Sequence, residues 1–359
     1  MATKNDPDQP LTVILQRVRK IQSEIHDINP AFIGGSLVED GGHNVMLGRS
    51  LLVRSADGQR PIVRLAAPLR FRPTTVTAGA TNPVVRLEGL FITRQEGTFP
   101  AGEPLIARAA LDALEILHST LDPGGHLLHP ERNDRAGFTG PQQPNLPPAM
   151  RLDDNHGFPP GPERAAFDDT TRVQIESSIV GPLLVDPDHT LVLERSVVDA
   201  GSGVDDEVAT AGIALKAVGT GPTTKYAART RVNGVTFFGK VLVESIDGAG
   251  GIWTQSLEVL NNQICCIRYS SFPTGDNRLP QHYASVEGAR VRFVSEIFGQ
   301  PGYGQLRLDT DFAVRERGPN DDAMGAFGFL LDAHKWRNLQ IRFREFMPVG
   351  IRPLLIPVT

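Results

Sequence analysis

The sequence predicts an all-β protein, a single-stranded right-handed parallel β-helix, and two observations indicate it. A short pattern recurs: two apolar residues with one residue between them, a Ser or Asn three positions after the second, and a further apolar residue two positions after that. Copies begin at Val85, Leu114, Val173, Leu191 and Leu257. Such alternation is typical of strands with one buried face, and repetition of one strand unit is typical of a solenoid. The 36 Gly and 28 Pro also favour short strands and turns over long helices.

The polar residue of the pattern is expected to point inward at the same place in successive coils. Stacked side chains of this kind hydrogen-bond one another, so we expect a structural ladder. Its predicted members are Ser119, Ser178, Ser196, Asn233 and Asn262. In the copy at Val85, Leu90 takes the place of the Ser.

Residues 1–50 are predicted to form an N-terminal helix and cap. Apolar residues from Leu11 to Ile28 follow Pro10 with a/d spacing, and Asn29 and Pro30 end the run. We expect an amphipathic helix that covers the open end of the solenoid. The alternative is a docking or coiled-coil helix, which would make the protein a homo-oligomeric spike.

Residues 51–290 are predicted to form the β-helix. Ala107–Leu121 has helical propensity, but its repeat matches the copy at Leu191, so we assign it to a coil. Pro and Gly dominate residues 123–170, which we expect to be one long loop. The remaining coils are expected at Val173, Leu191, Ile213, Thr230 and Leu257.

Residues 291–359 are predicted to form a C-terminal cap with a helix and a tail strand. The helix is expected over Ala323–Met347, with its N-cap at residues 320–322 and cations in its later turns. Those cations would form a solvated face or hold an anionic partner. Leu354–Val358 is expected to be a strand.

Composition limits the function. The net charge of −5 gives no electrostatic reason to expect nucleic acid as a partner. The two cysteines, Cys265 and Cys266, are adjacent, so we expect one inward and one outward thiol and no disulfide framework. No apolar signal region or membrane span is present, which predicts a cytoplasmic or particle-associated protein.

Carboxylates on neighbouring coils would be needed for carbohydrate chemistry on this scaffold. The best cluster is Asp199, Asp205, Asp206 and Glu207; otherwise these are solvated turn acids. Trp253 and Tyr269 are candidates for stacking on a glycan, with a core or coil-edge role as the alternative.

No metal site or cofactor is expected. The nine His residues are scattered without zinc-type spacing. The run from Asp153 to His156 offers oxygen ligands in series, but it lacks the Gly and the downstream Glu of an EF-hand loop.

The coils resemble the pectin-lyase-like right-handed β-helix. Three further stretches are similar to a group of uncharacterised bacterial proteins that are encoded beside phage-tail-like, contractile injection loci. The stretches are Asn261–Ser270, Phe298–Leu306 and Met324–Phe327, and the similarity continues from the last of these through the helix and tail that follow it. The resemblance covers roughly residues 80–359. It implies an accessory or surface component of a tail-like particle. No catalytic residue carries over from it, and the Asn-Thr-Asp, Gly-His-Gly and Arg-Ile-Lys signatures of pectinases are absent.

The first functional hypothesis is therefore a non-enzymatic structural or binding protein of such an assembly. Its expected partners are other proteins of a particle or of a cell surface, with a glycan as a further candidate. The alternative is a glycoside hydrolase or polysaccharide lyase on the same scaffold. Two carboxylates facing one groove would favour that alternative.

Overall fold

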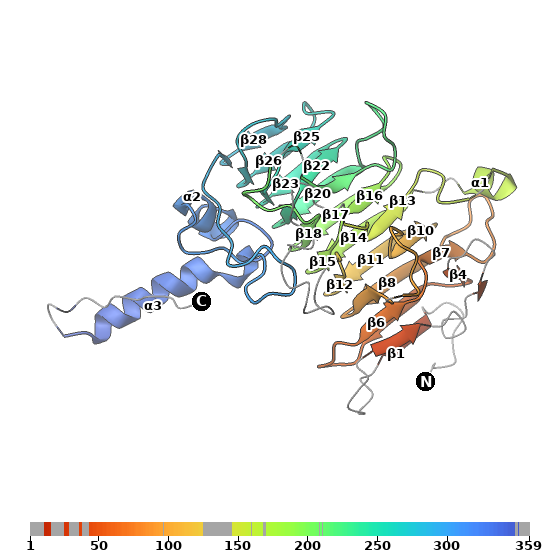
Figure 1. Ribbon diagram of the computed structural model, residues 1–359, viewed down its shortest axis with the longest axis horizontal. Coiled ribbons are helices and arrows are strands. Elements are labelled where there is room, and N and C mark those ends of the chain that lie inside the picture. The colour runs from red at the N-terminus through yellow and green to blue at the C-terminus, as the bar shows by residue number, and fades with distance from the viewer. Residues whose placement is uncertain are drawn as a thin grey trace.

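The computed structural model describes residues 11–15, 25–28, 36–37, 43–95, 97–124, 146–158, 160–167, 170–207, 209, 211–348 and 351. Three long sheets dominate these residues, and a helical segment follows them (Figure 1).

Each sheet collects every third strand of the chain, with few exceptions. The first sheet contains β1 (Leu11–Leu15), β5 (Leu51–Ser55), β8 (Val84–Glu88), β11 (Ala113–Leu117), β14 (Arg172–Glu176), β17 (Thr190–Glu194), β20 (Arg229–Asn233), β23 (Ile246–Ala249), β26 (Cys266–Arg268) and β28 (Gln281–Tyr283). The second contains β2 (Ile25–Ile28), β6 (Ile62–Leu65), β9 (Phe91–Arg94), β12 (Thr120–Leu121), β15 (Ile179–Val180), β18 (Val197–Asp199), β21 (Thr236–Phe238), β24 (Ile252–Trp253), β27 (Ser271–Phe272) and β29 (Val286–Glu287). The third contains β25 (Leu257–Val259), β22 (Lys240–Val243), β19 (Ile213–Lys216), β16 (Leu183–Val185), β13 (Met150–Leu152), β10 (Ile106–Ala109), β7 (Leu69–Pro73), β4 (His43–Leu47) and β3 (Ser36–Leu37).

The chain visits the sheets in a fixed cycle, as in β5, β6, β7 and then β8, β9, β10. Neighbouring strands are parallel, and the pair β3–β4 is antiparallel. One coil therefore contributes one strand to each sheet, which confirms the parallel β-helix. The assignment of Ala113–Leu117 to a coil is also confirmed, because β11 pairs with both β8 and β14.

Inward side chains stack in columns along the axis. Ile175, Leu193 and Val232 are aligned across β14, β17 and β20, and each is at most 1% exposed. One continuous apolar cluster runs from Val45 to Phe272. Because each coil buries its apolar row only against its neighbours, the stack as a whole forms the core.

The serine ladder exists at three of the five predicted positions. The Oγ of Ser119 accepts the Leu90 N–H at 3.1 Å, and the Oγ of Ser178 accepts the Ser119 N–H at 3.0 Å. The Oγ of Ser196 accepts the Ser178 N–H at 3.2 Å. Each hydroxyl oxygen therefore accepts a hydrogen bond from a buried backbone amide of the preceding coil.

Asn233 and Asn262 do not belong to this ladder. Asn233 is aligned with the outward Glu194 and is exposed, and Asn262 lies in the turn after β25, a strand of the third sheet. Strands of all three sheets alternate inward and outward side chains, so the short pattern at Leu257 matched a strand of the third sheet and not of the first. The serines that resume the ladder are Ser270, whose Oγ accepts the Gly251 N–H, and Ser285, whose Oγ accepts the Ser270 N–H.

The predicted N-terminal helix is wrong. Leu11–Leu15 is strand β1, aligned with Leu51–Ser55 of β5, and Ile25–Ile28 is strand β2, paired with β6. The run Thr12-Val13-Ile14 includes β-branched residues, which favour strands. The open edge of the sheet also offers backbone hydrogen-bond partners, which a strand uses and a helix does not. The spike built on helical heptads is contradicted for the same reason.

The predicted loop 123–170 contains regular structure. Met150–Leu152 forms β13 in the third sheet, and Pro162–Ala166 forms the short helix α1. Arg94 fixes the base of this excursion, donating to the Asp122 carbonyl at 3.1 Å and to the Pro148 carbonyl at 2.9 Å. Burial lowers the pKa of Arg94 to about 10, although the charge of Asp122 opposes the shift. Residues 125–145 lie outside the described part.

The C-terminal segment packs along the outer face of the second sheet. Phe293, Phe298 and Tyr303 join Val197 and Phe238 in one buried cluster. The segment then forms α2 (Phe312–Glu316), the 3₁₀ turns η4 (Pro319–Asp321) and η5 (Gly328–Leu330), and α3 (Asp332–Phe346). Apolar contacts with the sheet therefore set the position of these helices.

The C-terminal helix is shorter than predicted, because it begins at Asp332 and not at Ala323. The backbone has positive φ at Gly325 (87°) and at Leu331 (56°), which no helix accommodates. The predicted strand Leu354–Val358 lies outside the described residues. Across the described residues, no helix combines the length and apolar character needed to cross a membrane.

Candidate functional site

The acidic residues that the sequence grouped in one candidate cluster have different environments in the structure. Asp199 is 1% exposed, and its Oδ2 accepts the Tyr303 hydroxyl at 2.7 Å while its Oδ1 accepts the Gly201 N–H at 2.7 Å. The side chain of Asp205 is 75% exposed and pairs with Arg292 at 2.6 Å. One carboxylate is buried in packing contacts and the other lies on the surface.

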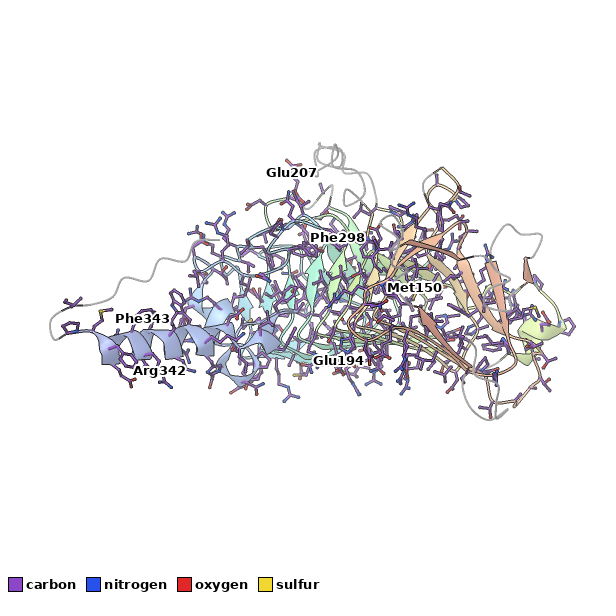
Figure 2. The ribbon with its side chains drawn as sticks, turned by 90° about the horizontal axis from the view of Figure 1, so that it is seen from below. Met150, Glu194, Glu207, Phe298, Arg342 and Phe343 are labelled. Atoms are coloured by element: carbon purple, nitrogen blue, oxygen red, sulfur yellow. The ribbon has the colours of Figure 1, made fainter. Side chains whose placement is uncertain are left out.

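Asp206 and Glu207 belong to the loop that follows β18. The Oδ2 of Asp206 accepts the Gly203 N–H at 2.7 Å, which closes a turn. Figure 2 shows Glu207 at one edge of the molecule, far from Glu194 on the opposite edge. The contacts of Asp199 and Asp205 connect the β-helix to the C-terminal segment, so the acids serve a structural purpose in this geometry.

The turn at Asp153–His156 is also held by internal contacts. The Oδ1 of Asp153 accepts the Gly157 N–H at 2.7 Å, and the His156 ring packs edge-on against Phe167 at 4.6 Å. Burial, together with the charge of nearby His189, lowers the pKa of His156 to about 4. Within the described ranges, no group of three His, Cys, Asp or Glu residues is placed to hold a metal ion.

Of the two predicted aromatic platforms, Trp253 is buried. It is 2% exposed and stacks between Phe237 at 5.5 Å and Phe272 at 4.9 Å, so it is a core residue. Tyr269 is 36% exposed, and its N–H donates to the carbonyl of Tyr283, which is 68% exposed. The sequence analysis missed Tyr283 because its coil lacks the repeat pattern.

A groove of about 340 Å³ lies at the base of α3. The apolar residues on one wall belong to the C-terminal segment: Val294, Leu306, Leu308, Met324 and Phe327. Trp336 and Leu339 of α3 form the opposite wall. We call this hollow the α3 groove.

Glu316 joins the two walls of the α3 groove. Its carboxylate pairs with Arg315 at 2.7 Å and with Arg337 of α3 at 2.6 Å, and its side chain is 11% exposed. Burial, the largest single effect, raises the pKa of Glu316, but hydrogen bonds from both arginines and their charges outweigh it and lower the pKa overall. The groove therefore carries a carboxylate whose charge is already neutralised.

The first turn of α3 is anchored by Asp322. This residue is 1% exposed, and its Oδ1 accepts N–H groups from Ala323 at 2.7 Å and from Ala333 at 3.4 Å. Ala333 is the one buried residue of α3. The helix is thus fixed at its N-terminal end, and its remainder projects away from the β-helix (Figures 1 and 2).

An apolar stripe runs along α3 and continues the groove wall. It consists of Trp336, Leu339, Phe343 and Phe346, at the 3-4-3 spacing of heptad a and d positions. Leu339 is 42% and Phe346 is 79% exposed. Trp336 and Phe343 are half-buried, and exposed large apolar side chains beside them are the kind of surface that marks a docking site. We call these four residues the α3 stripe.

Cations flank the stripe. Residues 335–359 contain five cations and one carboxylate, Glu345, a net charge of +4, which leaves −9 on residues 1–334 of a chain with net charge −5. Arg342 and Arg344 are exposed and form no ion pair within the described part of the chain. Figure 2 shows Arg342 and Phe343 on different sides of α3.

Part of this site was predictable from the sequence. The N-cap residues and the late cations indicated a C-terminal helix with a cationic face. The opposite wall was missed because the residues from Val294 to Phe327 follow no period and are placed by tertiary contacts.

Comparison of the chain with family models, with curated proteins and with solved structures finds no match.

Proposed function

We propose that this is a non-enzymatic binding or structural protein, in which the β-helix is a rigid body that holds α3 out for docking to another protein. The observation that supports this most directly is the α3 stripe, because α3 has one buried residue and leaves the large apolar side chains of Leu339 and Phe346 exposed. The resemblance of three sequence stretches to proteins encoded beside contractile injection loci suggests a phage-tail-like particle as the assembly.

The rigidity of the β-helix supports the same reading. Its strands are paired coil by coil, and the column of Ile175, Leu193 and Val232 is almost fully buried. A solenoid of this kind changes shape little on binding, so it positions a docking element at small entropic cost.

Capture from the native host tests the proposal. A tagged chain is compared with Phe343→Asp, which disrupts the α3 stripe, and with Ile341→Asp, which replaces an exposed residue on the other side of the helix. We expect the same partner with the unaltered chain and Ile341→Asp, and its loss with Phe343→Asp. Identical partners for all three chains would contradict the proposal.

The carbohydrate-active alternative has less support, since Asp199 is engaged by Tyr303 and Asp205 by Arg292. Polysaccharide cleavage by the purified chain that disappears with Asp205→Asn would favour it instead.

A further inference from the structure

We infer that the α3 groove and the α3 stripe bind an acidic amphipathic helix of a partner protein. This inference rests on the proposed function and adds the chemistry of the partner.

The shape of the site favours a helix as the occupant. The apolar lining of the α3 groove comes from two parts of the chain, Met324 and Phe327 of the C-terminal segment and Trp336 and Leu339 of α3. Beyond the groove, the stripe continues to Phe346 along one side of α3. A concave channel that leads onto a linear apolar row matches an amphipathic helix with anchors at i, i+3, i+4 and i+7.

The charges favour an acidic occupant. Lys335 and Arg342 lie on one flank of the stripe, where Lys335 also pairs with Asp332 at 3.3 Å, whereas Arg337 and Arg344 lie farther round the helix, as the helical spacing of 100° per residue requires. Glu316 within the groove is neutralised by Arg315 and Arg337, so it does not repel carboxylates strongly. Carboxylates at one margin of an incoming helix would meet Arg342, and residues 335–359 as a whole carry a net charge of +4.

Two other occupants fit less well. A second copy that paired α3 with α3 in antiparallel orientation would place Lys335 and Arg342 of one helix beside the same residues of the other, and like charges at such positions are destabilising. A flat membrane surface would reach Phe346, which is 79% exposed. It would fit less well against Trp336, because Trp336 lines a groove together with Met324 and Phe327.

The chain contains two tryptophans, which makes the site easy to monitor. Trp336 lines the groove, whereas Trp253 is 2% exposed in the core. Trp253→Phe leaves Trp336 as the single reporter, and Trp336→Phe leaves the buried control.

The experiment titrates the Trp253→Phe chain with a synthetic three-heptad helix that has Leu at a and d and Glu at e and g. A matched peptide has Lys in place of Glu. We expect the acidic peptide to shift Trp336 emission to the blue, to shield it from acrylamide, and to bind at least about tenfold more tightly than the Lys peptide at low salt. Phe343→Asp should weaken binding about tenfold or more, and Ile341→Asp should not.

Several results would overturn the inference. One is equal affinity for the acidic and the Lys peptides, and another is a Trp336 response to phosphatidylglycerol vesicles as large as the response to the acidic peptide. Self-association that Phe343→Asp abolishes would also overturn it, as would stronger acrylamide quenching of Trp336 in a chain that ends after Pro348. If neither peptide binds while capture in the host still depends on Phe343, the partner class is wrong and the proposed function stands. If capture does not depend on Phe343, the proposed function itself fails.

Discussion

The β-helix and α3 both carry apolar residues at regular intervals, but only the β-helix buries them. Leu193 in the column is 0% exposed, and Leu339 on α3 is 42% exposed. A strand needs neighbouring strands to satisfy its backbone, so its apolar row stacks on the next coil. A helix satisfies its own backbone and can project with its apolar row uncovered. The same kind of periodicity thus forms a core in one region and a binding surface in the other.

Truncation of a side chain in each region should give the largest contrast. Leu193→Ala opens a cavity in a packed column and should lower the free energy of unfolding by about 2–5 kcal/mol. Leu339→Ala removes an exposed side chain and should change it by less than about 0.5 kcal/mol. Chemical denaturation of both variants measures the difference, and similar losses would show that the stripe is part of the core.

Gly248 offers a second test of the column. It lies between Val232 and Ile267 in the inward row, with φ of 147°, and a Cβ there would lie 1.8 Å from the Val232 carbonyl oxygen. Gly248→Ala should therefore lower the free energy of unfolding by about 3 kcal/mol. The control is Gly58→Ala, at a positive-φ turn with open space around it, which should cost about 1 kcal/mol.

The serine ladder predicts a smaller loss. Ser196→Ala leaves the buried N–H of Ser178 without its partner and should cost about 1–2 kcal/mol. Asn262→Ala, outside the ladder, should be neutral within about 0.5 kcal/mol. Thermal denaturation of the two variants distinguishes them, and equal midpoints would contradict the ladder assignment.

The smallest effect is expected at the attachment of α3. Glu316→Gln removes the charge that holds Arg315 and Arg337 and should lower stability by about 1 kcal/mol. The pKa of Glu316 is lower in the folded chain than its ordinary value of 4.5, so its contribution is complete above pH 4.5 and is lost as the pH falls through the folded pKa. Helix content followed from pH 7 to pH 3 should fall less steeply at the acid end in Glu316→Gln. Identical profiles would contradict the role of this ion pair.

The repeat predicted the fold because strand alternation and coil stacking impose the same constraint on every coil. It failed where that constraint is ambiguous or hidden. The sequence of residues 11–28 has helical spacing, but residues 11–15 and 25–28 also satisfy strand pairing, and the partner strands β5 and β6 decide between the two. The coil at Ile246 was missed because Gly248 stands where the pattern requires an apolar side chain.

The candidate site was less predictable than the fold. The apolar face of α3 can be deduced from its spacing, but the groove exists only because the preceding segment folds back on the second sheet. That return depends on contacts distant in sequence, such as the Phe238–Phe293 ring pair at 5.0 Å and the bond from Tyr303 to Asp199. No local pattern encodes them.

Hydrogen exchange of the isolated chain, measured peptide by peptide, tests the central contrast most directly. The inner strands β14, β17 and β20 should exchange at the slow rate of global unfolding, and residues 338–346 of α3 should exchange much faster because few contacts hold that part of the helix. An α3 protected as strongly as these strands would mean that its stripe is already covered, which would contradict the account.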